Sequence, residues 1–225
     1  MTQSPNRRRF LYLLGATSAV SFAGYSAADE HGGDHADHDQ NEEQDRDDHD
    51  EGHQEHDEEY DGEFNHADVM FMQMMIPHHE QAIETAELIP GRTDQQELCD
   101  LGPEIIEVQE EEIELMHEWL DDAGVDPEDH EMDHDADDMD GMDHDEMEGM
   151  MTDEEMQELR GLEGEEFDCL FIEHMIHHHE GAILMADDVL EDGQADRVLE
   201  LAEDVIEVQE AEIELMEGWL QEWDC

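Results

Sequence analysis

The sequence repeats itself at a constant offset of 100 residues, and this repeat restricts the folds that the chain can adopt. Residues 68–120 recur at 168–220 without a gap. The string IEVQE stands at 106–110 and again at 206–210, and EIELM stands at 112–116 and again at 212–216. A gapless match of this length indicates that each copy is one structural unit.

Each unit reads as two helices. Apolar side chains recur every three or four residues over 71–86 and again over 105–120, which is the period of a helix with one buried face. The Ile-Pro-Gly at 89–91 should end the first helix. Thr93 with Gln96 matches a capping box for the second helix. Thr152 with Glu155 matches another, which should open a short helix before the second unit. Two such hairpins bury little alone, so we predict an all-α fold, a four-helix bundle made of two repeated hairpins.

The charge of the chain is extreme. There are 72 Asp and Glu residues against 7 Lys and Arg, which gives a formal net charge of −65. Like charge repels like, so nucleic acid and anionic membrane surfaces are excluded as partners. The chain contains no Lys, which favours a halophilic protein whose surface repulsion is screened by concentrated salt. We therefore expect the folded part to loosen in low salt.

The N-terminus resembles an export signal. Three arginines at 7–9 precede an apolar stretch at 10–23 and then small residues. This pattern predicts a twin-arginine-type signal peptide over 1–28, and an extracellular or cell-surface location. If the signal is not cleaved, it tethers the protein instead.

Two polar tracts interrupt the chain. Residues 29–62 are acidic and rich in His, and residues 123–150 are rich in Asp, Met and His. Such compositions predict disorder, although His and Met are also metal ligands. The first hairpin should then occupy 63–122, and a short helix plus the second hairpin should occupy 151–225. Residues 63–122 and 151–222 would form one bundle domain.

Three cysteines, Cys99, Cys169 and Cys225, match no CxxC metal motif. An exported protein can pair two of them and leave one over, and the spacing does not favour any one pairing.

Polar residues lie on the stripes that should be buried. Met75, His78 and His79 share one face of the first predicted helix. If the two helices of a hairpin run antiparallel, counting residues along both of them places Gln109 and Glu112 opposite these side chains. The same counting puts Met116 nearer to Asp68 and Met72, and the second unit repeats the arrangement. The further members of this candidate zone, as ligands or as groups that orient ligands, are Asp168, His174, Met175, His178, His179, Gln209, Glu212 and Met216.

Thioether and imidazole donors together suit copper, above all Cu(I). Zinc sites more often combine Cys or His with carboxylates. A di-iron bundle needs Glu-x-x-His strings that point inward; Glu114 and His117 match the string but fall off the buried stripe. Buried Met can equally be core filler. A metal-dependent oxidase on a ferritin-like scaffold, and a purely structural halophilic surface protein, therefore remain alternatives.

The pattern resembles a known family. Asp68…Phe71…Met75-Ile76…His78-His79, followed by Gln109…Glu112-Ile113…Met116…Trp119-Leu120 and the copy of both strings 100 residues later, is similar to the domain-of-unknown-function 305 family over residues 64–220. The resemblance implies a ferritin-like four-helix bundle that is usually exported. It also implies copper binding through Met and His, as in some periplasmic members.

On that basis the candidate copper ligands are Met75, His78, His79, Met116, Met175, His178, His179 and Met216. We expect a non-enzymatic exported protein that sequesters or hands over Cu(I). Its partners would be metal ions, and self-association or a copper-handling protein partner is left open.

Overall fold

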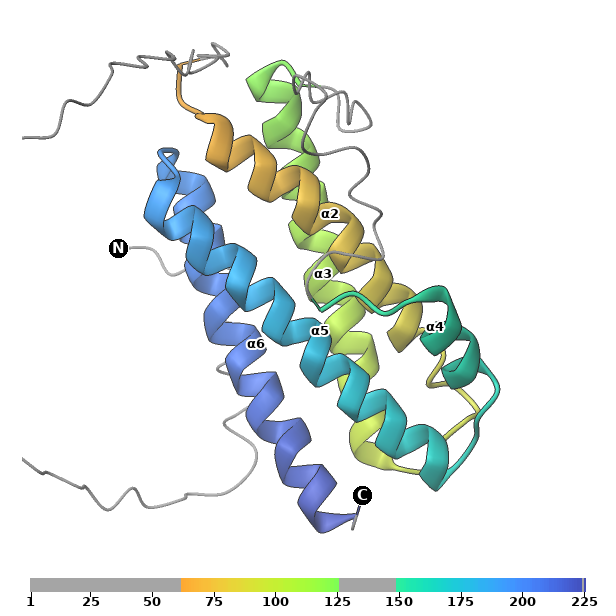
Figure 1. Cartoon of the computed structure of the whole chain (residues 1–225). Helices are drawn as coiled ribbons and strands as arrows, with labels where there is room; N and C mark the ends of the chain where they lie inside the picture. Colours follow the sequence, from red (N-terminus) through yellow and green to blue (C-terminus); the bar gives the residue numbers. More distant parts are fainter. Residues whose placement is uncertain (1–61, 126–148, 224) are drawn as a thin grey trace, which may run out of the picture.

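The computed structural model describes residues 62–125, 149–223 and 225. This part of the chain is all-helical and contains no strand, so the predicted fold class is confirmed for it (Figure 1). The predicted signal peptide and nearly all of both predicted disordered tracts lie outside the described residues. No described helix is long and apolar enough to span a bilayer. The helices are α2 (His66–Ala86), α3 (Gln96–Ala123), α4 (Asp153–Arg160), α5 (Glu165–Asp192) and α6 (Asp196–Glu222).

The four long helices pack as two hairpins. Helix α2 packs along α3, and α5 packs along α6, as the repeat predicts. The two hairpins meet mainly through α2 and α5, and the short helix α4 lies beside α5 (Figure 1). A ferritin-like relationship stays a prediction.

The core consists of two apolar clusters, one towards each end of the helices. One cluster combines the first half of α2 with the second half of α5 and includes Met75 and Met116. The other combines the first half of α5 with the end of α2 and includes Met175 and Met216. Burial of each large apolar side chain contributes about 1.5–3 kcal/mol. The paired histidines of α2 and α5 lie between the two clusters along these helices.

The helix starts agree only in part with the expected capping boxes. Thr152 and Glu155 form the box predicted at the start of α4. The box predicted for Thr93 and Gln96 is wrong, because α3 begins at Gln96 and its N-cap residue is Gln95. Gln96 is therefore the first residue of the helix and not the third. The Thr93 hydroxyl instead accepts a hydrogen bond from the Gln95 backbone N–H at 2.8 Å.

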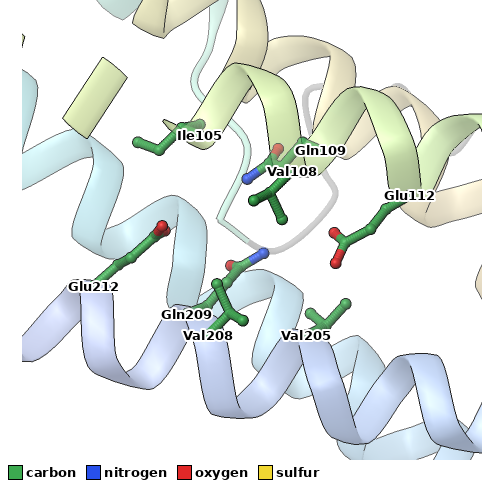
Figure 2. A pocket seen from close by; sticks show the side chains of 8 residues that line it. All are labelled: Ile105, Val108, Gln109, Glu112, Val205, Val208, Gln209 and Glu212. Atoms are coloured by element: carbon green, nitrogen blue, oxygen red, sulfur yellow. The ribbon is translucent and has the colours of Figure 1, made fainter. Parts of the chain in front are cut away.

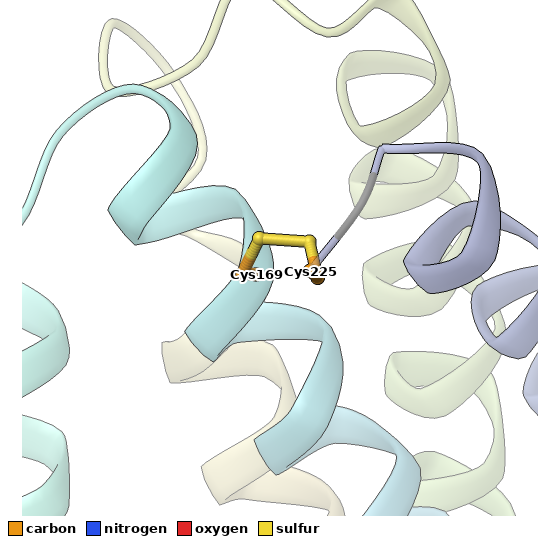
Figure 3. The surroundings of a disulfide bond; sticks show 2 residues. All are labelled: Cys169 and Cys225. Carbon is orange, nitrogen blue, oxygen red and sulfur yellow. A yellow bond between two sulfur atoms is a disulfide. The ribbon is translucent and has the colours of Figure 1, made fainter.

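One disulfide is present in the described residues. Cys169, in the first turns of α5, is bonded to Cys225 at the end of the chain (Figure 3). Cys99 is free and exposed. The bond holds the end of α6 against the start of α5, which decides the pairing that the sequence left open.

Candidate metal centre

The repeat brings four histidines together inside the molecule. His78 and His79 on α2, and His178 and His179 on α5, are all fully buried. The rings of His78 and His178 are in contact, with their centroids 3.7 Å apart and their planes tilted by 37°. These two positions are related by the repeat, and their ring contact lies where α2 and α5 meet.

Each hairpin contains one buried histidine–glutamate pair. The Nε2 atom of His79 lies 2.8 Å from the Glu112 Oε2 atom. In the second hairpin, the Nε2 atom of His179 lies 2.7 Å from the Glu212 Oε2 atom. Both carboxylates are buried. A buried carboxylate needs such a partner, and in return it fixes the orientation of the imidazole ring.

The second nitrogen of these two rings is available for a ligand. The Nδ1 atoms of His79 and His179 are buried and have no hydrogen-bond partner among the described residues. If Nε2–H donates to the glutamate, Nδ1 carries the lone pair that a metal ion requires. Burial, and after it the neighbouring imidazoles, lower the pKa of His178 well below its ordinary value of 6.5. That ring is therefore neutral at neutral pH.

The methionines lie one helical turn from the histidine–glutamate pairs. Met75 precedes His79 by four residues, and Met116 follows Glu112 by four. Since α2 and α3 are antiparallel, both steps run in the same direction, about 6 Å along the hairpin. Met116 is therefore level with Met75, about one turn from the level that sequence counting suggested.

Both thioethers are fully buried in one cluster. Met175 and Met216 repeat this arrangement in the other cluster.

The structure does not bring the two aspartates to the imidazoles. Asp68 and Asp168 precede His78 and His178 by ten residues, or about 15 Å of helix. His174 is half-buried, and its Nε2 atom has no hydrogen-bond partner among the described residues. These positions lie outside the buried group of four histidines.

Helices α3 and α6 face each other across a narrow crevice. Its volume of about 10 Å³ is close to the space that one water molecule requires. Gln109 and Gln209 occupy its middle, and Glu112 and Glu212 lie towards opposite ends (Figure 2). The Oε1 atoms of both glutamines have no hydrogen-bond partner among the described residues. The two histidine–glutamate pairs are thus separate, one in each hairpin.

The buried side chains that could donate to a metal ion are of two kinds, histidine nitrogen and methionine sulfur. In the described ranges, no three His, Cys, Asp or Glu side chains are grouped closely enough to hold one ion. Glu114 is exposed, as expected for a residue off the buried stripe. The interior therefore combines nitrogen donors with thioether sulfur, the combination that suits soft metals.

The described part of the chain consists of two duplicated helical hairpins with paired histidines and methionines inside. The sequence model of the family described as "Domain of unknown function (DUF305)" matches residues 68–220. The chain belongs to this family.

Solved structures support the assignment. A DUF305 protein from Streptomyces coelicolor, described as secreted, is 30% identical; the match covers 71% of this chain and 94% of that one, with a TM-score of 0.60. A DUF305 fragment from Deinococcus radiodurans is 29% identical over 71% of this chain and 98% of that one, also at 0.60. CopM in its Cu(II)-bound form is 31% identical over 69% of this chain and 97% of CopM, with a TM-score of 0.55. CopM is also matched in Cu(I)-bound and Ag-bound forms. No curated protein matches the chain significantly.

Proposed function

We propose that this protein is an exported, non-enzymatic copper-binding protein that sequesters Cu(I) or hands it over. The similarity to CopM, whose solved forms carry Cu(I), Cu(II) and Ag, supports a soft metal as the ligand. The description of the Streptomyces relative as secreted and the arginine-led N-terminal segment support export.

One observation carries the proposal. Each hairpin contains a buried imidazole whose Nδ1 atom has no hydrogen-bond partner in the described part of the chain, while a glutamate holds its Nε2 atom. Two fully buried thioethers lie one turn away in each hairpin. In the first hairpin, His79 with Met75 and Met116 would hold the ion. In the second, His179 with Met175 and Met216 would do so.

The two histidines in ring contact fit the same role. His78 and His178 lie between the two histidine–glutamate pairs, and a neutral imidazole is the protonation state that binds a metal. Thioether and neutral imidazole stabilise Cu(I) without adding negative charge to the interior. When bound, the ion would join the two helices of one hairpin.

A competition titration tests the proposal. Cu(I) is titrated against a strong chelator in molar salt, with the full chain and with the His79→Ala/His179→Ala variant. We expect tight binding that is lost in the double variant. His117→Ala is the matched control, since His117 lies on α3 off the buried stripe. Equal tight binding by the double variant would contradict the proposed site.

The glutamates provide a finer test. Glu112→Gln/Glu212→Gln keeps the size of both side chains but removes the charge that holds each Nε2–H. Loss of such an orienting partner typically weakens metal binding by about 10- to 100-fold. An unchanged Cu(I) affinity would show that these carboxylates do not orient the ligands.

A non-enzymatic role also has a direct check. Oxygen uptake is measured after the chain is loaded with Cu(I) or with Fe(II). We expect no uptake above that of the free ions, and catalytic uptake would favour the oxidase alternative.

A further inference from the structure

A short non-helical segment, which we call the strap, crosses α2 and α5 and leads into α4. It consists of residues 149–152 (Figure 1). The Gln81 side chain on α2 bonds twice to the backbone of Met151. Its Nε2 atom donates to the carbonyl oxygen at 2.8 Å, and its Oε1 atom accepts from the N–H group at 2.7 Å. One amide side chain therefore satisfies both backbone groups of Met151.

On α5 the strap is held by a close backbone contact. Gly149 has a φ of +85°, and a Cβ atom built on it would lie 2.9 Å from the Gly181 Cα atom. The same Cβ atom would lie 2.9 Å from the carbonyl oxygen of His177 and 3.0 Å from that of His178. Only glycine avoids both the backbone strain and these overlaps. Gly149 and Gly181 thus allow the strap to lie directly on α5.

The strap lies on the side of α2 and α5 that faces away from the histidine–glutamate pairs. Each residue of a helix turns the chain by about 100°, so Gln81 lies about 200° around α2 from His79. Gly181 has the same relation to His179 on α5. The helices α3 and α6, which carry the two glutamates, therefore cover one face of the α2–α5 pair, and the strap covers the other.

His78 and His178 lie between these two faces and next to the strap. Each of them precedes an anchor of the strap, Gln81 or Gly181, by three residues, which places it on the same side of its helix about one turn away. Both rings are fully buried. At this level the cover on the strap side is a single non-helical segment, whereas two long helices cover the opposite side.

The strap is attached less firmly than the helices that it covers. Neither core cluster includes a residue of the strap. Met151 is its one buried apolar side chain, and Met150 is only half-buried. Segments with few buried apolar contacts open locally at a lower free energy than core helices do. The strap can therefore open while α2 and α5 keep their helical hydrogen bonds.

We infer that the strap is the gate through which a ligand from solvent, a soft metal ion in the proposed function, reaches His78 and His178. The inference rests on the proposed function, because it names the route to the same site. Opening breaks the two hydrogen bonds of Gln81 and separates Gly149 from Gly181. The alternative route runs between α3 and α6, where Gln109 and Gln209 fill the crevice.

The first test needs no metal. Diethyl pyrocarbonate acylates neutral imidazole nitrogen atoms, so its initial rate of reaction with each histidine reports how often that ring is exposed. The full-length protein is labelled in molar salt, and peptide mass spectrometry locates the modified residues. We expect His78 and His178 to react before His79 and His179, because the strap opens on their side. His66, which is exposed at the start of α2, provides the reference rate.

Two variants should hold the gate open. Gln81→Ala removes both hydrogen bonds to Met151, which together correspond to about 5- to 150-fold in the opening equilibrium. Gly149→Ala places a Cβ atom against the backbone of α5 and should act in the same direction. In each variant, His78 and His178 should react at least fivefold faster than in the unchanged protein, relative to the reference rate.

Each variant has a matched control. Gln157→Ala makes the same change at an exposed glutamine of α4. Gly218→Ala adds a Cβ atom that would meet nothing within 4 Å. Both controls should leave every labelling rate unchanged. Circular dichroism in the same salt verifies that each variant is folded.

The second test follows the metal. Uptake of Cu(I) and its removal by a strong chelator are timed by stopped flow without oxygen. In Gln81→Ala both rates should rise by the same factor, at least fivefold. The equilibrium affinity should stay the same, because a gate changes the barrier and not the bound state.

The outcomes separate this inference from the proposed function. Unchanged labelling of His78 and His178 in both folded variants would overturn the inference, and so would earlier reaction of His79 and His179. Unchanged rates of Cu(I) uptake in folded Gln81→Ala would overturn it as well. Absence of tight Cu(I) binding by the unchanged protein would instead contradict the proposed function, and the labelling alone would then decide whether the strap is the route to these histidines.

Discussion

The disulfide between Cys169 and Cys225 should contribute a large share of the stability. It joins residues 56 apart in the sequence and so closes the whole α5–α6 hairpin into a loop. In the chain-entropy model, a cross-link of this span removes about 4 kcal/mol of entropic stabilisation from the unfolded state. Cys225→Ser should therefore lower the free energy of unfolding by about 4 kcal/mol. At 2–4 °C per kcal/mol for a domain of this size, the melting temperature should fall by about 10 °C.

The measurement is urea unfolding in molar salt, followed by far-ultraviolet circular dichroism. Cys99→Ser is the control, because Cys99 is free and exposed and its loss should change stability by less than about 0.5 kcal/mol. Adding a reductant to the native protein should reproduce the effect of Cys225→Ser. A loss below about 1 kcal/mol would refute the reasoning. It would mean that the end of α6 detaches locally and that the bond does not restrict the unfolded chain.

Three further predictions concern the rest of the fold. Asp68→Ala should cost about 3 kcal/mol or more in urea unfolding, because it leaves three backbone donors without their acceptor; Asp168→Ala should cost much less, and equal losses would contradict this. The unfolded chain protonates His178 below about pH 6.5 whereas the folded state resists protonation, so the free energy of unfolding should be steady above that pH and fall below it by up to about 1.4 kcal/mol per pH unit. A flat profile between pH 7.5 and 5.5, or an equal slope in His178→Gln, would count against this reading. Removal of salt should reduce the helical circular dichroism signal, since the net charge of −65 is then unscreened; an unchanged spectrum would argue against a halophilic surface.

Much of the fold could be predicted because helical periodicity is local. The spacing of Met75, His78 and His79 places all three on one side of α2 whatever the helix packs against. The offset of 100 residues transfers the same arrangement to α5. The capping box of Thr152 and Glu155 could be predicted for the same reason, since these two residues lie three positions apart in the sequence.

Contacts between helices were harder to predict. The pairing of His79 with Glu112 depends on the register of α2 against α3, which the connecting segment and the core decide together. A shift of one turn moves Met116 from the level of Met72 to that of Met75. The ring contact between His78 and His178 needs the two hairpins to meet through α2 and α5, and nothing within one hairpin requires this.

The sequence alone determined the two hairpins, their helical class and the face on which each donor lies, because these follow from spacings of three, four and 100 residues. Only the tertiary structure decided that the two histidine–glutamate pairs stay separate and that Cys169 pairs with Cys225. It also decided that both oxygens of Asp68 accept hydrogen bonds, whereas one oxygen of Asp168 has no partner among the described residues. The physical reason is that identical repeat positions meet different neighbours. Gln194 and Ala195 offer backbone donors to Asp68. In the equivalent turn the Gln95 N–H donates to Thr93 instead, and one oxygen of Asp168 finds no partner in the described part of the chain.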